Sequence, residues 1–278
     1  MIFARSLEVQ ASAHGFQTSD FNFHEPACYF GFGSPGNPMR KIIFELCAET
    51  IEACLVARNG GAHRIELCSG LSEGGITPSH ALIRAAVERS GIPIHVLVRP
   101  RGGDFLYSAA EVEVMREDIL HIKGLDAAGV VLGMLRADGT VDIEGTRALV
   151  ELARPMEVTF HRAFDATQSL PQALDAVIST GADRVLTSGG QHDVFAGSSS
   201  LAKLVLQAGN RIEIAVGGGL RIENAASLAR LTGAVHFHGS LRRTPAAHGA
   251  TAEPVGAGAN YVVNADHVRT IIHRLESA

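Results

Sequence analysis

Short apolar runs alternate with longer amphipathic stretches from about residue 42 to residue 238. The apolar runs are rich in β-branched residues, and the amphipathic stretches end at glycine-containing turns such as Asn59-Gly60-Gly61. This alternation is typical of βα units arranged around a parallel sheet. Eight strands are predicted, over residues 42–46, 64–67, 94–98, 129–135, 157–161, 184–188, 213–216 and 234–238.

Eight strands separated by helices predict an α/β fold with a single (β/α)8 TIM barrel, a domain of about 250 residues. An open, doubly wound sheet is the alternative. Such sheets commonly carry a glycine-rich phosphate turn after the first strand, whereas this chain has Cys47-Ala48-Glu49-Thr50 there. The pattern therefore favours the barrel.

The two ends of the chain differ from this repeating part. Residues 1–38 are rich in Phe, Gly, Ser and Pro and carry no sustained periodicity, so we expect a disordered leader or an upstream start. The TIM-barrel domain is then expected to span residues 39–278. Within it, residues 244–258 are rich in Ala, Gly and Pro and predict a surface loop, and residues 265–275 predict a last helix that packs on the barrel wall.

Composition excludes some classes of function. Hydrophobic residues make up 46% of the 278 residues, and the formal net charge is −5 at pH 7. No cluster of Lys and Arg predicts a nucleic-acid partner, and no apolar run approaches the roughly 18 residues of a membrane span. The cysteines are expected to be reduced thiols of a cytoplasmic protein, and they are Cys28, Cys47, Cys54 and Cys68.

Two predicted strands end in the same tripeptide, Glu45-Leu46-Cys47 and Glu66-Leu67-Cys68. Because strand side chains alternate between faces, each Glu shares a face with the Cys two residues later. In a barrel these residues lie inside, near the strand ends that carry catalytic groups. Buried carboxylates need partners, so Glu45 and Glu66 are candidate acid–base residues. The alternative is that a core arginine bridges each Glu and that each Cys is small apolar filler.

The third predicted strand runs into Arg99-Pro100-Arg101-Gly102-Gly103-Asp104. The planar guanidinium of arginine matches carboxylate and phosphate groups. Arg99, Arg101 and Asp104 are therefore predicted to hold an anionic, hydroxylated substrate. The alternative for Arg99 is an internal salt bridge to Glu45 or Glu66.

His161 ends the fifth predicted strand and shares a face with Thr159. A histidine at the mouth of a barrel is suited to general acid or base catalysis. Asp165 lies four residues later and is predicted to orient His161 or to bind a substrate hydroxyl. The alternative is a histidine that only bonds to a neighbouring strand.

Small and glycine-rich segments follow the last three predicted strands. Glycine-rich loops after strands seven and eight of a barrel commonly bind phosphate through backbone N–H groups. The alternative is that these glycines only form tight turns. The candidate substrate-binding residues in these segments are Thr187, Ser188, Gly218, Gly219, His238, Gly239 and Ser240.

Taken together, these motifs resemble the CutC family, whose members are usually described as copper homeostasis proteins. The resemblance runs from about Phe44 to Ser240, and it implies a TIM barrel, a cytoplasmic setting and homo-oligomers. It also implies a copper(I) site at Cys47 and Cys68, where two soft thiolates would suffice for a near-linear site. The stretches that carry the resemblance are Glu45–Cys47, Arg64–Pro78, Arg99–Tyr107, Val158–Asp165 and Val185–Gly189.

Three functional hypotheses follow from the sequence. The first is a copper(I)-binding protein that uses Cys47 and Cys68. The second is an enzyme for a small anionic metabolite, with Glu45, Glu66 and His161 as acid–base residues. The third is a divalent-metal site, for which oxygen and imidazole ligands are suited, made by Glu45, Glu66, Asp104 and His161.

Overall fold

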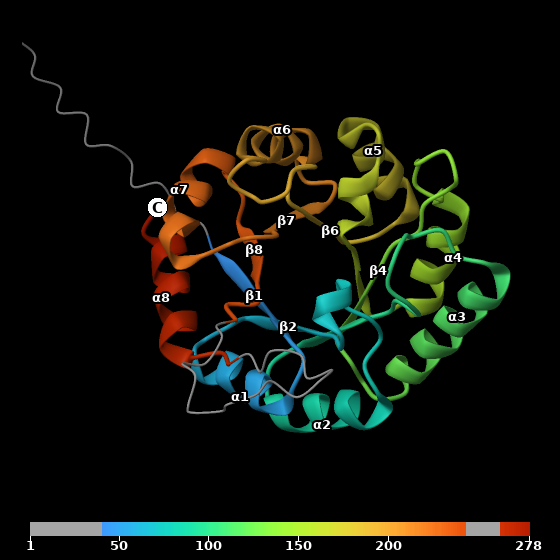
Figure 1. Cartoon of the computed structure of the whole chain (residues 1–278), viewed down its shortest axis with the longest axis horizontal. Helices are drawn as coiled ribbons and strands as arrows, with labels where there is room; N and C mark the ends of the chain where they lie inside the picture. Colours follow the sequence, from blue (N-terminus) through green and yellow to red (C-terminus); the bar gives the residue numbers. More distant parts are fainter. Residues whose placement is uncertain (1–40, 243–261) are drawn as a thin grey trace, which may run out of the picture. The chain divides into compact units, whose positions relative to one another are not determined.

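The computed structural model describes residues 41–242 and 262–278, all within one compact unit. Eight parallel strands close into a barrel in chain order, and the last strand pairs with the first. Helices surround this ring of strands (Figure 1). The predicted TIM barrel is confirmed, whereas the predicted leader and the loop at 244–258 lie outside the described residues.

The strands are β1 (Ile43–Ala48), β2 (Arg64–Leu67), β3 (Ile94–Leu97), β4 (Gly129–Leu132), β5 (Glu157–Phe160), β6 (Arg184–Thr187), β7 (Glu213–Gly217) and β8 (His236–Gly239). The α-helices are α1 (Ile51–Asn59), α2 (His80–Ser90), α3 (Ala109–Lys123), α4 (Ile143–Ala153), α5 (Leu170–Thr180), α6 (Ser198–Ala208), α7 (Ile222–Thr232) and α8 (Ala265–Glu276). Two short 3-10 helices follow β2 and β5, and they are η1 (Leu71–Glu73) and η2 (Arg162–Ala166).

Several helices begin at a side chain that accepts a hydrogen bond from the first turn. Thr50, Ser79 and Asp142 do so at α1, α2 and α4. At α3, Ser108 and Glu111 form a reciprocal capping box. Such caps satisfy backbone N–H groups that have no partner within the helix, and they fix where each helix starts after its loop.

The predicted strand over 129–135 is the largest difference from the observed elements. Strand β4 ends at Leu132, and Leu135 instead forms an isolated antiparallel bridge with Val141. Directly after β4, Gly133 lies beside His161, and a Cβ added there would be 2.6 Å from the imidazole Nδ1. The glycine therefore makes room for a side chain at the end of β5.

The last helix packs on the barrel wall as predicted. Val268, Ile271 and Leu275 of α8 are buried, and α8 contacts α7 and α1. At Gly60, an added Cβ would lie 2.4 Å from the Cβ of Val268. The glycine that ends α1 thus also provides the space into which α8 fits.

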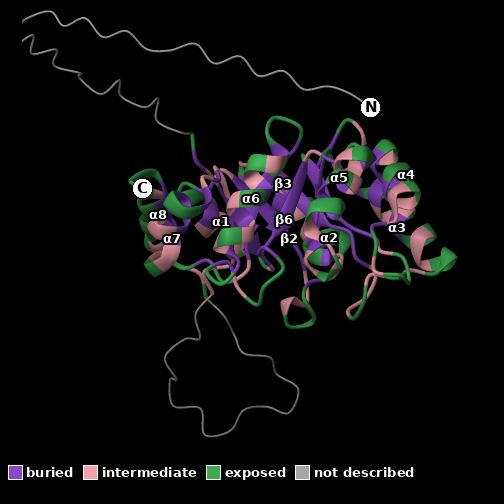
Figure 2. Ribbon diagram, turned by 90° about the horizontal axis from the view of Figure 1, so that it is seen from above, coloured by how far each residue is buried: buried purple, intermediate pink, exposed green. Residues whose placement is uncertain are grey.

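The outward faces of the strands and the inner faces of the helices form the main hydrophobic core. Buried residues concentrate there, whereas exposed residues cover the outer sides of the helices (Figure 2). The inside of the barrel is different, because its apolar cluster is small and consists of Cys47, Cys68, Leu97 and Val131. Charged side chains fill much of the remaining interior.

Glu45 lies at the centre of this charged interior. Its neighbours in the flanking strands are Arg64 of β2 and His238 of β8. Arg64 Nε donates to Glu45 Oε2, and His238 Nδ1 lies 2.7 Å from Glu45 Oε1. The three side chains are almost fully buried, so each one needs the others to compensate the cost of leaving water.

Replacing Arg64 by Met should reduce the free energy of unfolding by about 3–5 kcal/mol, because Glu45 would keep a buried charge without its main partner. Urea denaturation at pH 7 measures this loss. Arg211 offers a matched control, because it pairs with Asp175 at a surface where both side chains are more than half exposed. The same change at Arg211 should cost less than about 1 kcal/mol. Equal effects of the two substitutions would contradict the importance of the buried pair.

Candidate functional site

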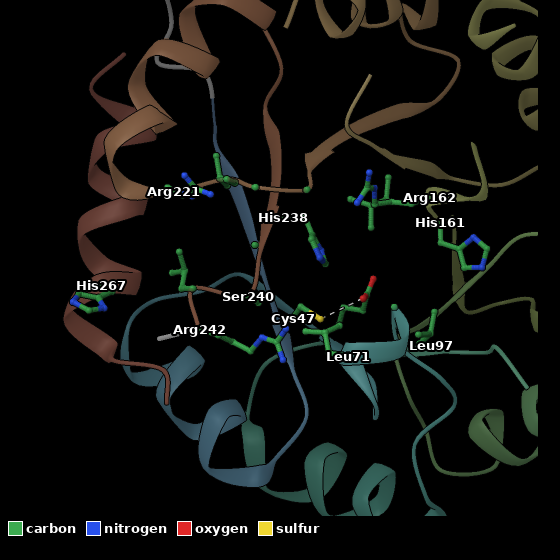
Figure 3. A pocket seen from close by; sticks show the side chains of 18 of the residues that line it. Cys47, Leu71, Leu97, His161, Arg162, Arg221, His238, Ser240, Arg242 and His267 are labelled. Atoms are coloured by element: carbon green, nitrogen blue, oxygen red, sulfur yellow. Dashed lines mark hydrogen bonds between the residues drawn. The ribbon is translucent and has the colours of Figure 1, made fainter. Parts of the chain in front are cut away.

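A cavity of about 520 Å³ lies at the carboxyl-terminal end of the barrel. The strand ends and the segments that follow them supply its walls, as is usual for the active sites of barrels. Figure 3 shows Cys47 and His238 near its middle, with His161 and Arg162 to one side. The predicted site residues that line it are Cys47, Glu66, Arg99, His161, Gly218, Gly219, His238, Gly239 and Ser240.

Cys47 lines this cavity, and the fully buried Cys68 lies against Cys47. Their sulfur atoms are 3.6 Å apart, and the Cys47 thiol donates to Glu66 Oε1 at 3.5 Å, a bond drawn in Figure 3. Contact with Cys68 and burial raise the pKa of the Cys47 thiol well above its usual value. Without a metal ion, Cys47 is therefore a protonated thiol at neutral pH.

Glu66 presents a carboxyl group that is ready to hold a proton. Burial and the neighbouring charge of Glu45 raise its pKa, although His238 opposes this. Only one oxygen of Glu66 is engaged by Cys47, and Oε2 has no hydrogen-bond partner among the described residues. Glu66 lines the cavity, so a bound molecule can reach this free oxygen.

Glu45 has a different position from Glu66, although both were predicted as acid–base residues. Burial alone would raise the pKa of Glu45, but Arg64 and His238 overcome it and hold the pKa well below its usual value. Glu45 does not line the cavity and lies behind His238. Its carboxylate stays ionised and fixes the orientation of the His238 ring.

His161 is neutral and has one free nitrogen. Its Nδ1 accepts a hydrogen bond from the backbone N–H of Ala163, which leaves the proton on Nε2. Nε2 is buried and has no partner in the described part of the chain. Burial and the charge of Arg99 lower the pKa of His161 to about 3. His161 therefore offers a hydrogen-bond donor to the cavity in which it lies.

The prediction that Asp165 orients His161 is wrong. Asp165 instead accepts hydrogen bonds from the Thr187 hydroxyl, from the backbone N–H groups of Ser188 and Gly190, and from Arg162. The 3-10 helix η2 turns Asp165 away from β5 and towards the end of β6. Thr187 and Ser188 lie behind the cavity wall, where they hold Asp165 in place.

Arg99 lies in the cavity wall but organises loops. Its guanidinium donates to the backbone carbonyls of Glu73, Gly75 and Gly103. The salt bridge to Glu45 or Glu66 that was considered for Arg99 does not form, because Arg64 takes that place. The prediction that a core arginine bridges a strand-end glutamate thus holds for Glu45 alone.

Arg101 and Asp104 lie apart from the other predicted substrate-binding residues. Arg101 pairs with Asp104 and Glu111 on the side of α3, and neither Arg101 nor Asp104 lines the cavity. The chain leaves the barrel after Arg99, so later residues of the motif point towards solvent. The structure supports no direct contact between these two residues and a ligand in the cavity.

One group of metal-ligating atoms is found among the described residues. Single ligand atoms of Cys47, Glu66 and His238 lie within 4.8 Å of one another, and all three residues are buried. The divalent-metal set predicted from the sequence is not assembled, because Asp104 is exposed and paired with Arg101. His161 also does not join Glu45 and Glu66 in such a group.

Some residues of the site carried no predicted role. Arg162, Arg221 and Arg242 line the cavity. Arg64 forms a buried ion pair with Glu45 inside the barrel. Arg64 could have been found by alternation, because it shares a strand face with Glu66. The other three arginines lie outside the strands, Arg162 in η2 and Arg221 and Arg242 in loops, where alternation gives no signal.

The family model that matches this chain, described as CutC family, covers residues 42–243. The chain belongs to the CutC family. A CutC family protein of Chromobacterium violaceum is 48% identical over 200 residues, which span 72% of this chain and 81% of the relative. One from Xanthomonas campestris pv. campestris is 43% identical over 235 residues, or 84% of this chain and 95% of the relative.

A solved structure supports the same family and the same barrel. It is the CutC protein of Streptococcus agalactiae, provisionally named a copper homeostasis protein, with 33% identity and a TM-score of 0.68. The match covers 72% of this chain and 98% of that chain. The resemblance to the CutC family seen in the sequence is therefore confirmed. Within the described residues, no helix is long and apolar enough to cross a membrane.

The burial of neutral His161 predicts a pH-dependent stability. Below a pH of about 6.5 the unfolded chain takes up a proton at this residue, but the folded chain does not until about pH 3. The free energy of unfolding should therefore fall with decreasing pH, by at most about 1.4 kcal/mol per pH unit from this group. Denaturation of the wild type and of His161→Asn between pH 7 and pH 5 should show a shallower fall in the variant. The control His192→Asn, at an 80% exposed side chain, should keep the wild-type slope, and an unchanged slope in His161→Asn would refute the assignment.

Proposed function

We propose that this CutC chain is an enzyme that binds a small anionic, hydroxylated metabolite and acts on it by proton transfer. The observation that carries the proposal is the pair of buried groups, Glu66 and His161, that face one cavity with unsatisfied polar atoms. A buried polar group without a partner is costly, so a ligand that supplies the partners would bind there. Perturbed titratable groups in a cleft are also typical of catalytic sites.

The two groups suit different roles. Glu66, with its raised pKa, would donate its carboxyl proton to an oxygen of the substrate and later take a proton back. The carboxylate left behind would be stabilised by the Cys47 thiol, which already donates to it, and by His238. His161 would donate its Nε2–H to a substrate oxygen and hold that oxygen in place without exchanging a proton.

The substitution Glu66→Gln keeps the shape of the side chain but removes the proton that it exchanges. A panel of anionic metabolites is first screened by thermal shift with metal-free protein, because a ligand that binds only the folded state raises the melting temperature. For a metabolite that the wild type converts, as followed by NMR, the variant should still bind but should be slower by about 10²–10⁴. Conversion by Glu66→Gln at the wild-type rate would refute the proposed role.

A specific observation also favours copper(I) binding as a second function. Cys47 contacts Cys68 and also belongs to a group of close ligand atoms with Glu66 and His238, and Glu45 holds the Nδ1 side of His238. A carboxylate behind a histidine commonly supports a metal ligand. With metal–sulfur bonds of about 2.3 Å, the zinc value, a linear site would need sulfur atoms about 4.6 Å apart. The observed 3.6 Å suits a bent site with a third ligand better than the near-linear site first considered.

The copper proposal predicts which cysteines matter. In competition with a chromophoric Cu(I) chelator under reducing conditions, Cys47→Ser combined with Cys68→Ser should abolish tight binding, because no soft thiolate ligand remains. Cys54 provides the control, since it is buried in α1 with its pKa raised to about 12 by burial. Cys54→Ala should keep the wild-type affinity, and unchanged affinity in the double variant would exclude the site.

The cellular compartment and the oligomeric state of the protein are part of the same proposal. Thiols that bind copper(I) must stay reduced, so we propose a reducing compartment such as the cytoplasm for this protein. The homo-oligomer implied by the family resemblance stays a prediction, and light scattering coupled to size exclusion measures it.

A further inference from the structure

The loops after β7 and β8 present backbone N–H groups that are not used within the protein. Gly218 and Gly219 have φ angles of +108° and +84°, values that few residues other than glycine adopt. The N–H groups of Gly218, Gly219 and Ser240 make no hydrogen bond to any described residue. All three residues line the cavity, so these donors are available to a bound molecule.

Arg162 lies directly against the first of these glycines. A Cβ added at Gly218 would be 3.1 Å from both Cζ and Nη1 of Arg162. Asp165 accepts from Nε of Arg162, and Arg162 Nη2 donates to the Ser188 hydroxyl. The guanidinium is therefore held in one orientation, and Nη1 makes no bond within the described chain.

The charge of the cavity favours an anion. Arg99, Arg162, Arg221 and Arg242 line it together with Glu66 and Glu223. Arg162 pairs with Asp165 and Arg242 with Glu49, whereas Arg99 and Arg221 form no ion pair with a described carboxylate. Helix α7 begins beside the cavity, and the amino-terminal end of a helix carries partial positive charge. His161, 95% buried, adds an Nε2–H that has no partner and lies in the same cavity.

We propose that the loops after β7 and β8, together with Arg162, bind the phosphate group of a phosphate monoester. This inference rests on the proposed enzymatic function and deepens it, because it names the substrate class. The N–H groups of Gly218 and Gly219 and the N–H and hydroxyl of Ser240 surround a tetrahedral oxyanion from the β7 and β8 sides. Arg162 approaches it from the side of β5.

The arrangement suits phosphate better than a planar carboxylate. A carboxylate is bound most strongly by two parallel N–H groups along one edge of a guanidinium. In Arg162 the edge formed by Nε and Nη2 is already engaged by Asp165 and Ser188. What remains is a set of single donors from three strand ends, and several separate donors are the usual phosphate cradle of a barrel.

Calorimetric titration of the full chain with inorganic phosphate, at constant ionic strength, tests the proposal. We expect phosphate to bind and acetate not to bind. Arg162→Met should weaken phosphate binding at least tenfold, and so should Ser240→Asp, which places a negative charge in the cradle. Arg211→Met removes one arginine from a surface pair outside the cavity, so it should keep the affinity within twofold.

Three results would overturn the proposal: no phosphate binding, equal binding of acetate, or unchanged phosphate affinity in Ser240→Asp. Ser240→Asp also decides the matter if Arg162→Met fails to fold. Binding of inorganic phosphate requires no turnover, so it is independent of Glu66→Gln. Conversion of a non-phosphorylated anion, dependent on Glu66 and without phosphate binding, would refute this inference and leave the proposed enzymatic function standing.

Discussion

The structure depends on a carboxylate buried inside a closed barrel. Glu45 has charged neighbours in both flanking strands, Arg64 on one side and His238 on the other. An ionised carboxylate in such a place is tolerated only when its partners are well placed. The pairing therefore constrains β8, β1 and β2 to one register and one mutual rotation, and a slip by one residue would turn each of these side chains to the opposite face.

This constraint separates residues that support the cavity from residues that face it. Glu45 and Asp165 both have their carboxyl groups behind the wall, and each fixes a basic side chain that reaches the cavity, His238 for one and Arg162 for the other. The groups that face the cavity are different, because Glu66 and His161 keep polar atoms without partners. In a preorganised binding site, charged groups behind the cavity wall hold the lining residues in place, and polar atoms without partners face the cavity.

Much of this could be predicted from the sequence, because two simple regularities apply to a barrel. Alternation assigned Glu45, Cys47 and Glu66 to the interior, and the position of strand ends located His161 and the glycine loops. Neither regularity predicts how a side chain beyond the strand turns. Asp165 lies in a 3-10 helix that directs it to β6, and Arg101 follows the chain out of the barrel. The sequence also did not identify the partner of Glu45. Several arginines could have paired with it, and only the packing of the barrel selects Arg64.

The contact between Glu45 and His238 joins residues 193 positions apart in the chain. It forms only when β8 closes against β1, since these are the first and last strands of the ring. While β8 is still inside the ribosome, the emerged part of the nascent chain therefore contains Glu45 and Cys47 but not His238. The group formed by Cys47, Glu66 and His238 is thus complete only when β8 has joined the ring, and a partly synthesised barrel does not yet present it.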